Sequence, residues 1–277
     1  YKGGQKMPKT VSDIAQMKSN DKIAVLTGYD STMTTLCNSV DVILVGDSAG
    51  MVMLGYDNTR DVTMDDMIRF TTAVKNAKTD SLIVTDLPIN SYENEDSAIA
   101  NSKRLVQAGA HAVKLEGGRE VSKIIKAVVD SGIPVMGHLG LLPQTAEKYS
   151  IQAKKSEDAE NLIQDAKILE KSGAFSIVLE MVTSDVTKII TDSVKIPTIG
   201  IGSGIDCDGQ VLVIHDMLGM FEKIKPKFAK RYLNLSEEIR KAVNSYVDDV
   251  KGKRFPEKEH TFSMEKDELE KLEKEIV

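Results

Sequence analysis

The stretch Val42-Ile43-Leu44-Val45-Gly46-Asp47-Ser48 is a short apolar run that ends in a glycine, an acid and a small polar residue. An apolar run followed by an acid and a turn recurs at 82–88 (LIVTDLP) and at 112–118 (AVKLEGG). Strands of this kind are typical of parallel sheets in α/β proteins, where the carboxyl ends of the strands share one rim. We therefore expect three carboxylates to converge on one pocket, those of Asp47, Asp86 and Glu116.

Three carboxylates in one pocket repel one another unless a cation or a shared proton lies between them. Hard oxygen donors favour a hard divalent cation, and Mg²⁺ is the simplest candidate. A single aspartate after a strand is more often a helix cap than a metal ligand. The recurrence of the pattern at three successive strands therefore carries the prediction of a Mg²⁺ site.

Short apolar runs alternate with helical stretches along the chain. The predicted strands are 23–26, 42–45, 82–84, 112–115, 134–136, 176–179, 198–201 and 211–214. Eight strands alternating with helices within about 250 residues indicate an α/β fold, the (β/α)8 TIM barrel. The competing doubly wound open sheet favours a glycine-rich turn after the first strand, which 27–30 (TGYD) does not supply.

The predicted helices are 10–18, 64–77, 93–108, 120–131, 157–172 and 185–193. Thr10 or Ser12 is expected to cap the first of them. Gly109, Gly132 and Gly173 each follow a helical stretch, where a helix end favours a left-handed residue.

Composition narrows the possible partners. The chain has 277 residues, 41% of them hydrophobic, and a net charge of −6, so it can bury a large core. The chain has no basic block with interleaved aromatic residues, the pattern typical of nucleic-acid-binding proteins. It also has no apolar run of the roughly 20 residues that a membrane span needs. Cys37 and Cys207 are interpreted as reduced thiols of a cytoplasmic protein.

The expected domain organisation is simple. We expect residues 1–9 to be a disordered remnant of cloning or processing, and residues 10–262 to form one barrel domain. Residues 263–277 form a charged helical tail, in which Leu269, Leu272 and Ile276 have helical spacing. This tail is either solvated or packed on the barrel or a neighbouring subunit.

Further polar residues stand at the predicted strand ends: Ser48, Lys114, His138 and Glu180. Lys114 and His138 also fit structural roles, as an ion-pair partner of Glu116 and as a core histidine. The segment 200–204 (GIGSG) is either an anion cradle after strand seven or a tight turn. For His215 and Asp216, after the last strand, we favour a structural role.

Nine motifs in register resemble the ketopantoate hydroxymethyltransferase family over residues 10–262. They are 45–51 (VGDSAGM), 86–88 (DLP), 113–118 (VKLEGG), 137–141 (GHLGL), 179–180 (LE), 200–204 (GIGSG), 208–210 (DGQ), 215–216 (HD) and 226–230 (PKFAK). The resemblance implies a barrel of the phosphoenolpyruvate mutase/isocitrate lyase type. It also implies transfer of a one-carbon unit from 5,10-methylenetetrahydrofolate to 3-methyl-2-oxobutanoate, which gives 2-dehydropantoate for pantothenate and coenzyme A biosynthesis.

The resemblance also implies roles for the matched positions. Asp47, Asp86 and Glu116 match the Mg²⁺ group, and Glu180 matches the general base. The residues expected to contact the oxoacid are Asp47, Ser48, Asp86, Lys114 and His138. The family implies a homo-oligomer, a decamer. The chain departs from the family at 144–155, where many members have a Gly-Gly-containing stretch.

Three other functions remain open from the residues. A lyase of the same superfamily often uses a cysteine on the loop after strand five, and 140–155 contains none. A phosphosugar-binding barrel would use the 202–204 turn but would not need three acids. A non-catalytic member with a vestigial pocket is disfavoured by an intact acid group and base.

Overall fold

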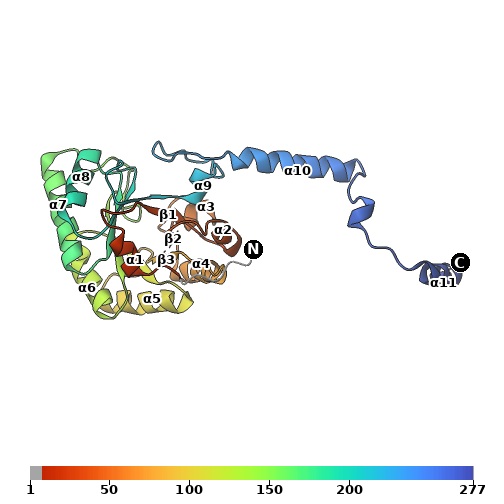
Figure 1. The fold of residues 1–277 in the computed structure, drawn as a ribbon, viewed down its shortest axis with the longest axis horizontal. Helices are drawn as coiled ribbons and strands as arrows, with labels where there is room; N and C mark the ends of the chain where they lie inside the picture. The colour runs from red at the N-terminus through yellow and green to blue at the C-terminus, as the bar shows by residue number, and fades with distance from the viewer. Residues whose placement is uncertain (1–7, 277) are drawn as a thin grey trace.

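Eight parallel strands close into a barrel in chain order in the computed structural model, which describes residues 8–276 (Figure 1). Residues 1–7 of the predicted remnant lie outside the described residues. The first and last strands close the ring, with Ile23 opposite Gly209. The strands are β1 (Ile23–Thr27), β2 (Val42–Val45), β3 (Leu82–Asp86), β4 (Ala112–Glu116), β5 (Val135–Gly140), β6 (Ser176–Glu180), β7 (Thr198–Ile201) and β8 (Gly209–Leu212). The predicted (β/α)8 barrel is confirmed.

Helices surround this barrel and continue beyond it. They are α1 (Val11–Gln16), α2 (Ser31–Leu36), α3 (Ala49–Val52), α4 (Met64–Asn76), α5 (Glu95–Ala108), η1 (Arg119–Val121), α6 (Ser122–Asp130), α7 (Ser156–Lys171), α8 (Ser184–Ser193), α9 (Ile214–Met217), α10 (Leu235–Lys251), η2 (Lys258–His260) and α11 (Lys266–Ile276). Thr10 caps α1 by accepting a hydrogen bond from the Asp13 amide. Gly109, Gly132 and Gly173 have φ angles of 124°, 89° and 94°, as predicted for residues that end helices.

Four strand ends differ from the sequence prediction in ways that affect the rim. β3, β4 and β6 each run through their acid, so Asp86, Glu116 and Glu180 are the last residues of strands. The predicted strand 211–214 is wrong at its end, because β8 stops at Leu212 and Ile214 opens α9. The amide of Ile214 donates to Thr27 Oγ1 at 3.0 Å, which ties the start of this helix to β1.

The alternation of side chains along the strands builds two apolar layers. One layer fills the barrel and includes Val25, Leu44 and Met136. The other lies between the strands and the helices, where Ile43 and Leu115 pack against the buried faces of the helices. Ile14 of α1 joins the inner layer and is fully buried, so α1 closes the end of the barrel at which the strands begin.

The C-terminal arm, residues 235–276, runs away from the barrel (Figure 1). Ser236 is the one buried residue of α10, and α11 has none. Leu269, Leu272 and Ile276 of the tail are therefore exposed and do not pack on their own barrel. No helix within residues 8–276 is both long enough and apolar enough to cross a membrane.

Candidate active site

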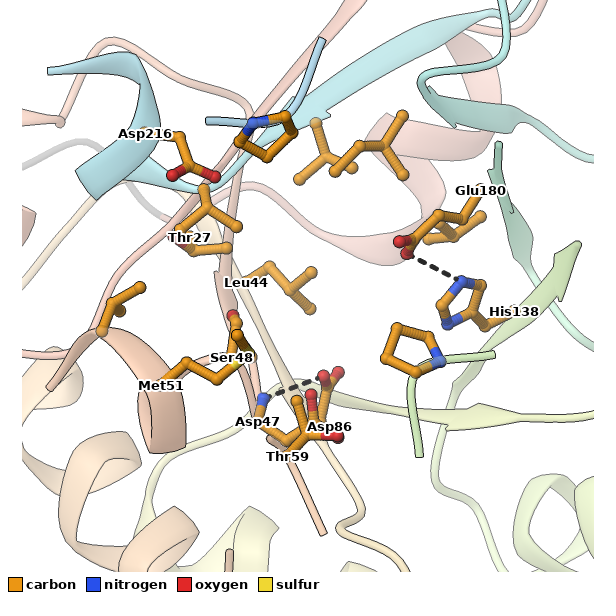
Figure 2. Close-up of a pocket in the computed structure, with 18 of the residues that line it drawn as sticks. Thr27, Leu44, Asp47, Ser48, Met51, Thr59, Asp86, His138, Glu180 and Asp216 are labelled. Carbon is orange, nitrogen blue, oxygen red and sulfur yellow. Dashed lines mark hydrogen bonds and ion pairs between the residues drawn. The ribbon is translucent and has the colours of Figure 1, made fainter. Parts of the chain in front are cut away.

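A cavity of about 370 Å³ opens at the carboxyl ends of the strands. Seven residues singled out from the sequence line it together: Asp47, Ser48, Asp86, Lys114, Glu116, His138 and Glu180. Parallel pairing explains this, because the register sets Asp86 beside Lys114 and, two residues further along β4, Glu116 beside His138, all at the carboxyl ends of the strands. Figure 2 shows Asp47 and Asp86 on one side of this cavity, with His138 and Glu180 across from them.

Asp47, Asp86 and Lys114 form a buried charged group. The Asp47 amide donates to Asp86 Oδ2 at 3.1 Å, and Lys114 Nζ lies 3.0 Å from Asp86 Oδ1. Burial alone would lower the pKa of Lys114, but the carboxylates of Asp86, Glu116 and Asp47 outweigh burial and raise that pKa. Lys114 therefore carries its charge into the cavity.

Glu116, His138 and Glu180 form a row along the opposite wall. Glu116 Oε1 lies 3.2 Å from His138 Nδ1, and Glu180 Oε2 lies 3.4 Å from His138 Nε2 (Figure 2). Neither contact is aligned as a hydrogen bond. Burial and the Lys114 charge lower the pKa of His138. The carboxylates of Glu116 and Glu180 outweigh both effects and raise this pKa to about 9. His138 is therefore an imidazolium between two carboxylates.

The acids of the cavity fit a bound cation. Burial raises the pKa of Asp47 to about 8, and the charges of Asp86 and Glu116 contribute to that shift. Such a shift means that one positive charge from Lys114 does not balance three neighbouring acids. Hard carboxylate oxygens are the ligands that Mg²⁺ prefers. The donor set therefore suits a divalent cation held by Asp47 and Asp86.

Glu116 differs from the other two acids of the predicted Mg²⁺ group. One of its oxygens faces His138, and the other accepts a hydrogen bond from the Gln144 amide at 3.1 Å. Across residues 8–276, no three His, Cys, Asp or Glu side chains gather tightly enough to form a ready-made metal cage. Glu116 is thus held by protein donors, which suits contact with a cation through water, since Mg²⁺ keeps several waters in protein sites.

Gln144 is a site residue that the sequence analysis did not single out. Its side-chain amide donates to Asp47 Oδ2 at 2.8 Å and to the Leu87 carbonyl at 3.0 Å, and its own oxygen accepts from the Tyr92 hydroxyl. The loop after β5 therefore reaches across the rim to β2 and β3. A lone glutamine in a loop gives no periodic signal, and the chain departs from the family pattern just at this residue.

Tyr29 is a second such residue. It lies after β1, it is 2% exposed, and its hydroxyl is 2.8 Å from Ser48 Oγ. This contact fixes the hydroxyl of Ser48 at the edge of the cavity, in the place where the sequence predicts an oxoacid contact.

Of the remaining predicted positions, Ser203 and His215 make structural contacts, whereas Asp216 lines the cavity. Ser203 Oγ donates to the Leu179 carbonyl at 2.7 Å and accepts from the Val182 amide at 3.1 Å, so it ties β7 to β6. This observation favours the tight-turn interpretation of 200–204. His215 packs against the Tyr29 ring, with centroids 5.6 Å apart. Asp216, for which a structural role was favoured, instead lines the cavity.

Comparison with known proteins agrees with this geometry. Residues 8–258 match the model of a family described as ketopantoate hydroxymethyltransferase. The chain belongs to this family. A 3-methyl-2-oxobutanoate hydroxymethyltransferase of Nitrosopumilus maritimus is 55% identical over 98% of this chain and 99% of its own. One of Syntrophus aciditrophicus is 49% identical over 91% of this chain and 96% of its own.

Solved structures with low sequence identity share the fold. A phosphonopyruvate hydrolase, solved as a complex with oxalate and Mg²⁺, has a TM-score of 0.62 at 12% identity and covers 97% of this chain, with 96% of its own chain covered. Phosphoenolpyruvate phosphomutase of Streptomyces platensis subsp. rosaceus has a TM-score of 0.62 at 14% identity over 97% of this chain and 100% of its own. These two enzymes therefore share the barrel fold of this chain.

Proposed function

We propose that the protein transfers a hydroxymethyl group from 5,10-methylenetetrahydrofolate to 3-methyl-2-oxobutanoate, with Mg²⁺, and so supplies 2-dehydropantoate for pantothenate and coenzyme A biosynthesis. The observation that carries this proposal is the shared cavity. Asp47, after β2, and Asp86 of β3 lie on one side of it, and Glu180 of β6 lies across from them (Figure 2). Lys114 of β4 lies 3.0 Å from Asp86. Family membership supports the same reaction, since the relatives bear the name of this transferase.

The oxoacid binds on the side of the cavity that holds Lys114. The charged Lys114 attracts the carboxylate of the substrate, and the Ser48 hydroxyl, held by Tyr29, donates a hydrogen bond to it. Mg²⁺ held by Asp47 and Asp86 would act as a Lewis acid that stabilises negative charge on the keto oxygen. His138 adds a second positive charge on the neighbouring strand β5, opposite Glu116.

Glu180 is the general base of the proposed reaction. Its carboxylate takes the proton from C3 of the oxoacid, and the electron pair of that bond forms the enolate. The enolate carbon then bonds to the one-carbon unit as the carbon–nitrogen bonds of the carrier break. One water is consumed, because its hydroxyl stays on the transferred carbon while its other proton and the C3 proton end on the two carrier nitrogens.

The other candidate functions gain no support from the cavity. Neither Cys37 nor Cys207 lines it, so the cysteine of a superfamily lyase has no counterpart there. The hydroxyl of Ser203, which a phosphosugar site would use, is engaged by backbone groups of β6 and the residue that follows it.

The deciding experiment follows the C3 proton of 3-methyl-2-oxobutanoate by NMR in D₂O, with protein and Mg²⁺ but without folate. We expect this proton to exchange for deuterium, and addition of 5,10-methylenetetrahydrofolate to give 2-dehydropantoate. A chelated sample is the control. The absence of both exchange and product with fully folded protein would contradict the proposal.

Two further parts of the proposal concern the setting of the enzyme. The chain assembles as a homo-oligomer, for which the exposed apolar residues of the C-terminal arm are the support. The family resemblance implies a decamer, and mass measurement in solution tests that number. Cytoplasmic localisation, proposed from two reduced thiols, is tested by fractionation of the source cells.

A further inference from the structure

One carboxylate of the cavity, that of Asp216, lies apart from the charged residues at the ends of β2 to β6. Asp216 lies on α9, directly after β8, and is 8% exposed. Figure 2 shows its carboxylate pointing into the cavity, far across from Asp47 and Asp86. Burial raises the pKa of this carboxyl, and only the more distant charge of Arg231 opposes the shift. Within residues 8–276 its oxygens make no hydrogen bond or ion pair.

The wall formed by β8 and the segment that follows it is mostly apolar. Its lining side chains are Val211, Val213, Phe221, Ile224, Pro226 and Phe228, with one charged residue among them, Lys227. The Asp216 oxygens reach the cavity and are not among the fully buried atoms without a partner. A ligand that fills the cavity would strip water from this carboxylate, which costs free energy unless the ligand supplies a donor. A ligand with hydrogen-bond donors would remove that cost, whereas an anion would be repelled.

The two ends of the cavity therefore suit different ligands, an anion at one end and a hydrogen-bond donor at the other. Lys114 of β4 and His138 of β5 place two basic side chains among the acids of the strand ends, and together with a bound cation they suit the carboxylate of the oxoacid. The Asp216 wall repels that carboxylate, and it suits a flat, largely apolar ring that has N–H donors along one edge. A pterin ring has this chemistry, because its N3–H and 2-amino group lie side by side and match the two oxygens of a carboxylate.

The geometry points to Asp216 as the residue that binds the one-carbon carrier, by accepting hydrogen bonds from the N3–H and 2-amino group of its pterin ring. This inference rests on the proposed function, in which the carrier is a folate. It assigns Asp216 to recognition of the carrier, remote from the carbon that Glu180 deprotonates. The oxoacid half of the reaction does not need it.

The first test separates the two half-reactions with Asp216→Asn, which keeps the shape of the side chain but removes its charge. We expect the KM for 5,10-methylenetetrahydrofolate to rise roughly ten- to hundredfold, as for loss of a hydrogen bond to a charged group. Exchange of the C3 proton without folate should change less than about threefold. Asp206→Asn is the matched control, since Asp206 is exposed and does not line the cavity.

The second test changes the ligand instead of the protein. Calorimetry compares tetrahydrofolate with its 2-desamino-2-methyl analogue, which lacks the 2-amino donor. We expect the wild-type protein to bind the analogue roughly tenfold more weakly, and Asp216→Asn to bind both ligands alike. The wild-type comparison alone tests whether the 2-amino group of the carrier is recognised, even if the variant does not fold.

Two results would overturn the inference alone: an unchanged KM for the carrier in Asp216→Asn, or equal affinity of the wild-type protein for the two ligands. Failure of the wild-type protein to transfer the one-carbon unit is a different result. It would overturn the proposed function, and this inference with it, and it is observed without any substitution.

Discussion

The rim of the barrel buries charged residues, whereas the C-terminal arm exposes apolar ones. At the rim, Asp47 and Lys114 are charged residues with only 5% and 4% exposure. On the arm, Val243 and Tyr246 of α10 are apolar or aromatic residues with 53% and 57% exposure. The rim pairs its buried charges only in part, since its acids outnumber its basic side chains. The apolar face of α10 has one buried residue, Ser236, and does not pack on the barrel. The difference teaches that each region leaves a different need unmet within the described chain, positive charge at the rim and an apolar contact on the arm.

The largest effect at the rim is expected from Glu180→Gln. This variant keeps shape and hydrogen bonding but cannot accept a proton, so folate-independent exchange of the C3 proton should fall by about 10²–10⁴-fold. Oxoacid binding in the presence of Mg²⁺, measured by calorimetry, should persist. Exchange at the wild-type rate would mean that another residue is the base, and His138, 3.4 Å from Glu180, would be tested next.

A smaller effect is expected from Asp86→Asn. The substitution removes a negative oxygen that pairs with Lys114 and receives the Asp47 amide, so the affinity for Mg²⁺ should fall by roughly 10–100-fold. Calorimetric titration with Mg²⁺ measures this directly, and Asp65→Asn on the outer helix α4 is the control. Full activity of the wild-type protein after exhaustive chelation would contradict a metal role for the rim.

The strand pattern predicted the rim because it depends on local periodicity. Asp86 and Glu116 end buried strands, and parallel pairing then brings both to the same rim without any further information. Gln144 could not be found in this way, because its contacts with Asp47 and Leu87 depend on the path of a loop. Asp216 was misjudged for a related reason, since the turn from β8 into α9 decides where its side chain points.

The arm was predicted in part. Helical spacing located α11 correctly, but spacing says nothing about which surface a helix contacts. α10 carries Ile239, Val243, Tyr246 and Val250 at spacings of four, three and four, which we name the α10 stripe. Such a stripe ordinarily covers a core. The structure shows instead that α10 runs away from the barrel (Figure 1) and that the stripe is exposed.

The next prediction concerns the α10 stripe. The double variant Val243→Glu/Tyr246→Glu introduces two charges on the exposed apolar face, so the mass in light scattering should fall if that face joins copies of the chain. Asn244→Glu/Ser245→Glu adds the same charge beside the stripe and is the matched control. An unchanged mass for the stripe variant, with the wild-type protein oligomeric, would remove the arm from the assembly.

The smallest effect is expected from truncation after Phe262. Leu269 and Leu272 are about as exposed as the residues of the α10 stripe and do not touch the barrel, so the melting temperature should shift by less than about 2 °C. The full-length chain is the reference. A larger drop would show that α11 stabilises the protein, and a lower mass with unchanged melting would assign it to a subunit contact.

The position of α1 at the closed end of the barrel bears on the order in which substrates bind. Ile14 is buried in the inner layer, so α1 blocks the end at which the strands begin, and the cavity opens at the other end, where the strands finish. In the proposed reaction, both substrates then enter and both products leave through that opening. The small oxoacid reaches the charged strand ends only while the mouth is free, and a bulky carrier that follows covers it. Steady-state kinetics should therefore be sequential and ordered, with the oxoacid first to bind, and excess carrier should inhibit competitively against it.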